Sequence, residues 1–166
     1  MRPRGQADDR PSRHTQDPIG AHTATARWRP PVPAALPNFL LVDNAAAVRH
    51  MLRSHLRSVL PTAQIAECET AADCIEQAGT GRVDAVFIGM GLATGESALP
   101  VVTKMLQDNP ERPVIVCSCK SREHDDVQQA FGRGAFAYIA KPVHIDAVRD
   151  VCSRIEELRG RRGRIL

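Results

Sequence analysis

A fivefold alternation of strand and helix signals between residues 38 and 158 constrains the fold of this chain more than any other feature. A short, continuous apolar run bounded by polar and turn residues is typical of a strand that is buried on both faces. We expect four strands of this kind and a more polar second strand, at 39–42, 64–69, 84–88, 113–117 and 136–140. Each is followed by apolar residues at helical spacing, which predicts an amphipathic helix.

Local signals place the ends of the expected helices. Thr70 followed by Asp73 resembles a capping box and opens the second helix, and Gly79 closes it. Ser121 is a candidate N-cap of the fourth helix, and Pro61 ends the first. The helices are therefore expected at about 48–59, 70–79, 97–107, 121–132 and 143–158.

Continuous apolar strands that alternate with amphipathic helices predict an α/β fold with a parallel sheet covered on both faces. Crossovers between parallel strands are right-handed, which leaves few topologies. We expect the flavodoxin-like, doubly wound order 2-1-3-4-5.

Charge and composition divide the chain into three parts. Residues 1–37 hold seven prolines, six Arg and three Asp, and we predict a disordered, Arg- and Pro-rich extension. Residues 38–160 form the predicted domain, with 13 Lys/Arg against 16 Asp/Glu, and 161–166 form a basic tail with three Arg. The sequence contains no run of eighteen apolar residues and no apolar signal region, so we expect a cytoplasmic protein that does not span a membrane.

The five cysteines lie inside expected strands and helices, which favours reduced thiols over a disulfide framework. Cys117 and Cys119 are the closest pair in sequence, and a redox or metal role for them is the less favoured reading, because no His or Cys cluster accompanies them.

The third expected strand ends in a glycine-rich loop. Gly89, Gly91 and Gly95 follow its apolar run, and we expect them to supply conformational freedom. In an open α/β sheet the loops after the carboxyl ends of the strands usually carry function.

Four segments converge at that edge of the predicted sheet. Asp43 and Asn44 follow the first strand, Gly89 ends the third, Ser118 follows the fourth and Lys141 follows the fifth. An acidic group, a hydroxyl and a lysine around strand ends suit a phosphoryl and magnesium site.

The segments FLLVDN, DAVFIGMGL, PVIVCSC and AYIAKPV, in this order and spacing, resemble the receiver domain of bacterial two-component response regulators over about residues 38–158. The resemblance implies transfer of a phosphoryl group from a histidine kinase to an aspartate at the end of strand three. It also implies that an acidic pair after strand one binds magnesium, and that a Ser or Thr and a lysine contact the phosphoryl group. It further implies a cis bond before Pro142.

The chain departs from this pattern at two positions. The position that resembles the phosphoacceptor is Gly89, which has no nucleophile, and the acidic pair resembles Asp43-Asn44, whose second member is neutral. Asp43 and Asn44 are thus at most weak metal ligands, and we expect no cofactor. Lys141 is expected to pair with Asp43 instead. Asp84 is an alternative acceptor, but it lies at the start of the third strand, away from this edge, and Glu96 as a permanent charge is another alternative.

The resemblance also implies a partner surface on the fourth helix, fifth strand and fifth helix. It would include Arg122, Asp126, Gln129, Arg133, Tyr138 and Arg149. The expected partner is a histidine kinase, another response regulator or a transcription regulator, and a homodimer could use the same surface. A solvated face has the same mixed charge.

We therefore expect a phosphorylation-independent, receiver-like signalling module and not an enzyme, since the six histidines do not cluster and no catalytic triad is apparent. One alternative is a sensor of a nucleotide or another metabolite, which would use the vacated pocket and the glycine loop. Another is a nucleic-acid-associated regulator that acts through its basic ends, with salt-sensitive binding.

Overall fold

A computed structural model of the chain describes residues 36–93 and 95–162. These residues form a five-stranded parallel sheet with the order β2-β1-β3-β4-β5, which confirms the predicted flavodoxin-like topology. Except for Leu36 and Pro37, the predicted extension 1–37 lies outside the described residues, as do positions 163–166 of the predicted tail. The strands are β1 (Asn38–Val42), β2 (Gln64–Cys68), β3 (Ala85–Gly89), β4 (Val114–Ser118) and β5 (Ala137–Ala140).

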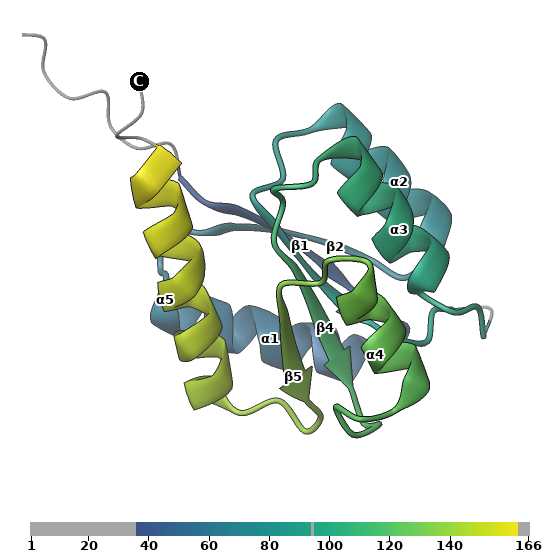
Figure 1. Cartoon of the computed structure of the whole chain (residues 1–166). Coiled ribbons are helices and arrows are strands. Elements are labelled where there is room, and N and C mark those ends of the chain that lie inside the picture. Colours follow the sequence, from purple (N-terminus) through teal and green to yellow (C-terminus); the bar gives the residue numbers. More distant parts are fainter. Residues whose placement is uncertain (1–35, 94, 163–166) are drawn as a thin grey trace, which may run out of the picture. The chain divides into compact units, whose positions relative to one another are not determined.

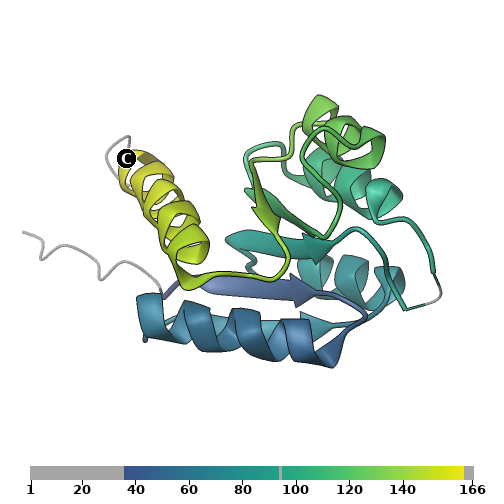
Figure 2. The same ribbon diagram turned by 90° about the horizontal axis from the view of Figure 1, so that it is seen from below.

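Helices cover both faces of the sheet (Figures 1 and 2). One apolar cluster joins one face of the sheet to α1 and α5, and the other joins the opposite face to α2, α3 and α4. Every residue of β3 and β4 is buried, as the continuous apolar runs predict. The helices are α1 (Ala46–Val59), α2 (Ala71–Thr80), α3 (Leu99–Asp108), α4 (Asp125–Gly132) and α5 (Ile145–Arg162).

The sequence signals at the helix ends were partly right. The Thr70 hydroxyl accepts a hydrogen bond from Asp73 N at 3.1 Å, so Thr70 caps α2 as predicted, and it donates one to the Asp73 carboxylate at 2.7 Å, in place of the main-chain bond of a full capping box. Gly79 does not close α2, which continues to Thr80. Ser121 is not the cap of α4. His124 is, and its ring nitrogen accepts a hydrogen bond from Asp126 N.

The last helix, α5, runs to Arg162 and therefore extends two residues into the segment predicted as a tail. The Lys141–Pro142 peptide bond is cis, as the resemblance implies. Within the part of the chain that the structure describes, none of the helices combines the length and the apolar character that a membrane span requires.

Candidate functional site

The predicted site residues do lie at the carboxyl edge of the sheet. Gly89 and Ser118 are the last residues of β3 and β4, Asp43 follows β1 directly, and Lys141 follows β5 directly. The sheet order puts β1 and β4 on either side of β3, so Asp43 and Ser118 flank the end of the strand that carries Gly89. Asn44 is exposed.

Asp43 and Lys141 form an ion pair across this edge. Lys141 Nζ lies 2.5 Å from Asp43 Oδ2, and the two side chains are 18% and 1% exposed. Asp43 Oδ1 also accepts a hydrogen bond from Ala45 N at 3.0 Å, just before α1 begins. The predicted Asp43–Lys141 pairing is thus present. It satisfies a buried carboxylate that would otherwise cost several kcal/mol to hold in the interior, by an order-of-magnitude estimate.

Gly89 is required for space and not for backbone freedom. Its φ is not positive, and among the glycines of the described chain only Gly95 and Gly134 have a positive φ. The expectation that Gly89 and Gly91 supply conformational freedom is therefore wrong, whereas Gly95, with φ of 75°, fits it. A Cβ built on Gly89 would lie 2.9 Å from Cγ of Asp43, still closer to its Oδ2, and 3.5 Å from Nζ of Lys141. The Asp43 carboxylate occupies the space that a side chain at position 89 needs.

A pocket of about 330 Å³ opens next to this ion pair. It brings Ser118 and Lys141 together with the loop after β3, but Asp43, Asn44 and Gly89 do not line it. The residues around it come from β4, from the loops after β3 and β4, from α4 and from the end of β5: Met90, Gly91, Gly95, Glu96, Ser97, Cys117, Ser118, Cys119, Lys120, Asp126 and Lys141.

Both lysines of this pocket are already paired. Lys141 binds Asp43, and Lys120 Nζ lies 2.5 Å from Asp126 Oδ2. The hydrogen bond from Lys120 lowers the pKa of the exposed Asp126 carboxyl. The Ser118 hydroxyl accepts a hydrogen bond from Lys120 N at 3.1 Å. The pocket therefore offers hydrogen-bonding groups but little uncompensated positive charge.

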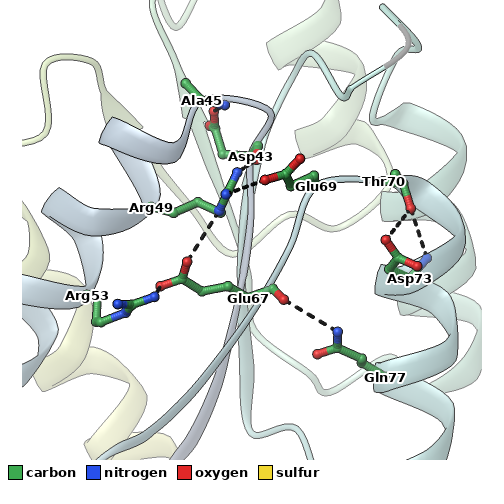
Figure 3. Close-up of polar contacts among 9 residues, drawn as sticks. All are labelled: Asp43, Ala45, Arg49, Arg53, Glu67, Glu69, Thr70, Asp73 and Gln77. Carbon is green, nitrogen blue, oxygen red and sulfur yellow. Dashed lines mark hydrogen bonds and ion pairs between the residues drawn. The ribbon is translucent and has the colours of Figure 1, made fainter.

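A buried arginine on α1 supports Asp43 from the other side (Figure 3). Arg49 donates to the main-chain oxygen of Asp43 at 2.6 Å, to Glu69 Oε1 at 2.5 Å and to Glu67 Oε2 at 3.3 Å. Arg53, one turn further along α1, forms an ion pair with the other oxygen of Glu67. The sequence patterns used above did not predict this cluster. Glu67 on β2 and Glu69 directly after it, together with an arginine-rich helix, were the signal that could have found it.

The donor set at this edge does not fit a divalent cation. Magnesium prefers several oxygen ligands, chiefly carboxylates and waters. Here the one buried carboxylate, Asp43, is neutralised by Lys141, Asn44 is exposed and Gly89 has no side chain. Over residues 36–93 and 95–162, no group of three or more His, Cys, Asp or Glu side chains could hold a metal ion.

The two sequence alternatives for an acceptor carboxylate lie in different places. Asp84 precedes β3, at the opposite edge of the sheet, where it accepts hydrogen bonds from Asn38 N at 2.9 Å and from Arg82 at 3.0 Å. It is therefore not a displaced acceptor. Glu96 is exposed on the loop after β3 and lines the pocket.

The residues predicted for a partner surface are engaged within the chain. The half-buried Tyr138 donates its hydroxyl proton to Lys120 O at 2.6 Å, and desolvation raises its pKa. The Arg122 guanidinium lies 4.9 Å from the centroid of the Phe131 ring. The remaining predicted members bond to neighbours: Asp126 to Lys120, Arg133 to Gln129, and Arg149 to Asp146.

The five cysteines are free, with no disulfide between any two of them. Cys117 is buried in β4 and Cys119 is exposed, so these two thiols do not form a common redox or metal site. Burial raises the pKa of the Cys117 and Cys152 thiols to about 12 each.

Comparison with known proteins agrees with this fold. The family model described as "Response regulator receiver domain" matches residues 39–153. No curated protein sequence matches the chain. A receiver domain protein from Methanospirillum hungatei is 17% identical, with a TM-score of 0.68, over 76% of this chain and 99% of that one. The receiver domain of an HD domain-containing protein from Pseudomonas fluorescens is also 17% identical, with a TM-score of 0.69, over 79% and 94%.

A third similar structure comes from a response regulator of Burkholderia pseudomallei that holds a phosphorylated aspartic acid, a calcium ion and citrate. It is 19% identical, with a TM-score of 0.60, over 68% of this chain and 64% of that one. At these identities the structures support the fold alone. The family match covers well over half of the sequence, and this chain therefore belongs to the response regulator receiver domain family.

Proposed function

We propose that this receiver domain signals through protein–protein interaction without being phosphorylated at the end of β3. One observation carries the proposal: the strand ends in Gly89, and the Asp43 carboxylate fills the volume that an acceptor side chain would need. An acyl phosphate requires a carboxylate nucleophile, which glycine does not provide.

The neighbouring groups support the same reading. Lys141, which in the family resemblance contacts the phosphoryl group, already has a buried partner in Asp43 at 2.5 Å. In the similar structure from Burkholderia pseudomallei, an aspartate carries the phosphoryl group. The exposed Glu96 could provide a fixed negative charge beside the pocket, but its position on a loop makes it a poor substitute for a group at the strand end.

Receiver domains act as signalling modules that interact with kinases and effector domains. For this chain we propose a histidine kinase, another response regulator or a transcription regulator as the partner. The candidate surface is the one named from the sequence, on α4, β5 and α5, and a homodimer through it is the alternative. Tyr138 connects β5 to the loop before α4 through its hydrogen bond to Lys120 O.

The metabolite-sensor alternative rests on the pocket of about 330 Å³. An anionic ligand there would have to compete with Asp43 for Lys141 and with Asp126 for Lys120. This competition is the reason that we rank the sensor second. Stabilisation of the chain by a nucleotide in a thermal-shift screen would reverse the ranking.

Intact-mass spectrometry tests the proposal. The chain is incubated with magnesium and acetyl phosphate beside a receiver domain that carries the acceptor aspartate. We expect the control to gain the mass of one phosphoryl group and this chain to keep its mass. A base-labile phosphoryl adduct on this chain would contradict the proposal. If the mass of this chain is unchanged, a pull-down with the full-length chain, followed by mass spectrometry, identifies the partner.

A further inference from the structure

The outward face of α1 is basic and hydroxyl-rich. A shallow groove of about 370 Å³ runs along it, and its lining contains two arginines, one histidine and two serines: His50, Arg53, Ser54, Arg57 and Ser58. None of these side chains is aliphatic, and none is Phe, Tyr or Trp. The helix contains three arginines, two histidines and no Asp or Glu.

The groove lies on the more positively charged of the two helix layers that cover the sheet. The helices α1 and α5, which cover one face of the sheet (Figure 1), hold eight arginines against four acidic residues, a net charge of +4, of which Glu67 and Glu69 offset two units through their ion pairs with Arg49 and Arg53. The helices α2, α3 and α4 on the other face hold one lysine against five acidic residues, a net charge of −4. A separation of charge of this size attracts a polyanion to one face.

Part of the basic groove is uncompensated. Within the described part of the chain, neither His50 nor Arg57 has an ion pair or a hydrogen-bonded partner for its side chain, and both are exposed. Arg53 shares the Glu67 carboxylate with Arg49. By contrast, Lys120, Arg122 and Arg149, near the predicted partner surface, are all engaged by neighbours.

We propose that the α1 groove binds the phosphate backbone of a nucleic acid without reading its sequence. Arginine, serine and histidine side chains are donors that contact phosphate oxygens. Protein-binding surfaces usually centre on aromatic or large apolar anchors, which this groove lacks, and nucleic-acid surfaces are more polar and more positive. The groove has no Phe, Tyr or Trp side chain, and the His50 imidazole is its one ring on which a base could stack.

This site is part of the folded domain and is distinct from the basic ends of the sequence. It goes beyond the proposed signalling function, because it needs neither the pocket beside Lys141 nor a protein partner. Binding should depend strongly on salt, since each phosphate that is neutralised releases counterions.

Fluorescence anisotropy with the full-length chain tests the proposal. A labelled DNA duplex is titrated at several salt concentrations, with two unrelated base sequences. We expect Arg57→Gln to weaken binding equally for both sequences and to lower the slope of log K against log salt by about 0.9, the loss of one phosphate contact. Arg57→Lys should restore most of the slope. Arg133→Gln, at the residue directly after α4, removes the same charge from the other face and should leave the slope unchanged.

Three outcomes would overturn the proposal. One is an unchanged slope in Arg57→Gln, which would assign any binding to other parts of the chain. Another is an equal effect of Arg57→Gln and Arg133→Gln, which would indicate a response to net charge alone. The third is Arg57-dependent binding of a poly-glutamate peptide without binding of the duplex, which would identify an acidic protein as the partner. Unchanged melting temperatures of the variants exclude misfolding as the cause of any loss.

Discussion

The Asp43 carboxylate lies in the volume that a side chain on Gly89 would occupy, and it is held there by Lys141. Oδ2 accepts from the lysine at 2.5 Å, while Oδ1 accepts from Ala45 N at 3.0 Å. The ion pair in this position therefore depends on the glycine, because a Cβ at position 89 would collide with the carboxylate. The following predictions begin from this relationship.

Gly89→Ala should destabilise the domain by about 1–3 kcal/mol, the usual cost of overpacking a buried site. The new Cβ would lie 2.9 Å from Cγ of Asp43, whose carboxylate has Lys141 and Ala45 on either side. Gly79→Ala on exposed α2 is the matched control, because a Cβ there meets nothing within 4 Å. It should be neutral or stabilising by up to about 1 kcal/mol. Urea unfolding measures both, and equal stability of the two variants would contradict the proposed lack of space.

Lys141→Met should destabilise the domain by about 3 kcal/mol, because it leaves the Asp43 carboxylate buried and unpaired. The double variant Asp43→Asn/Lys141→Met should recover part of that loss, since no buried charge remains. Lys104→Met breaks the exposed Lys104–Asp108 pair on α3 and should change stability by about 0.5 kcal/mol or less. A double-mutant cycle from chemical denaturation measures the coupling, and additive effects would contradict it.

Arg49→Met should cost about 2–4 kcal/mol, because it removes the donor shared by Asp43 O, Glu67 and Glu69. Arg53→Met is the control. Its side chain is 38% exposed, and Glu67 keeps Arg49 in that variant, so a loss of about 1 kcal/mol or less is expected. Calorimetric melting compares the two, and a larger effect of Arg53→Met would refute the central role of Arg49.

One thiol in five should react quickly with a soluble thiol reagent under native conditions. Cys119 is exposed, whereas Cys68, Cys74, Cys117 and Cys152 are buried. Reactivity requires access and a thiolate, and burial denies access to all four, including Cys68, whose pKa is lowered by a hydrogen bond with Cys74. We expect Cys119→Ser to abolish the fast phase and denaturation to release the other four thiols. Fast labelling of a second cysteine in the native chain would show that the core opens more readily than the structure indicates.

Stability should fall in alkaline solution because of buried thiols. The pKa of Cys117 and of Cys152 is raised from 9.0 to about 12 in the folded chain. Above about pH 9 the unfolded state loses these protons while the folded state keeps them, so the free energy of unfolding decreases until the folded pKa is reached. Each thiol contributes a slope of about 1.4 kcal/mol per pH unit in this window.

The double variant Cys117→Ala/Cys152→Ala should flatten this alkaline decline, although Cys74 and Tyr138, whose pKa values are also raised, keep part of it. Urea midpoints measured across the alkaline range provide the comparison. A variant that declines as steeply as the parent chain would show that other groups control the effect.

The sequence alone predicted the fold because its signals are local and consistent. The apolar runs at 39–42 and 113–117 have no polar interruption, which requires a strand covered on both sides, and their alternation with helices leaves a parallel sheet. Thr70 and Asp73 cap α2 across three residues, so that their bond could be predicted from spacing. The errors at Gly79 and Ser121 concern helix ends, where one short segment offers several possible caps.

The sequence also placed Asp43, Gly89, Ser118 and Lys141 at one edge, because the carboxyl ends of parallel strands share an edge. Only the tertiary structure decided how these residues are arranged along that edge. Asp43 and Lys141 form an ion pair beside Gly89, the pocket is on the β4 side, and Asn44 is exposed to solvent. The role of Arg49 also depends on tertiary packing. Arg49 lies on α1, and its partner Glu67 lies on β2, 18 residues later in the sequence. Distances between side chains on different strands depend on sheet register and helix packing, whereas residue types and their periodicity are properties of the chain itself.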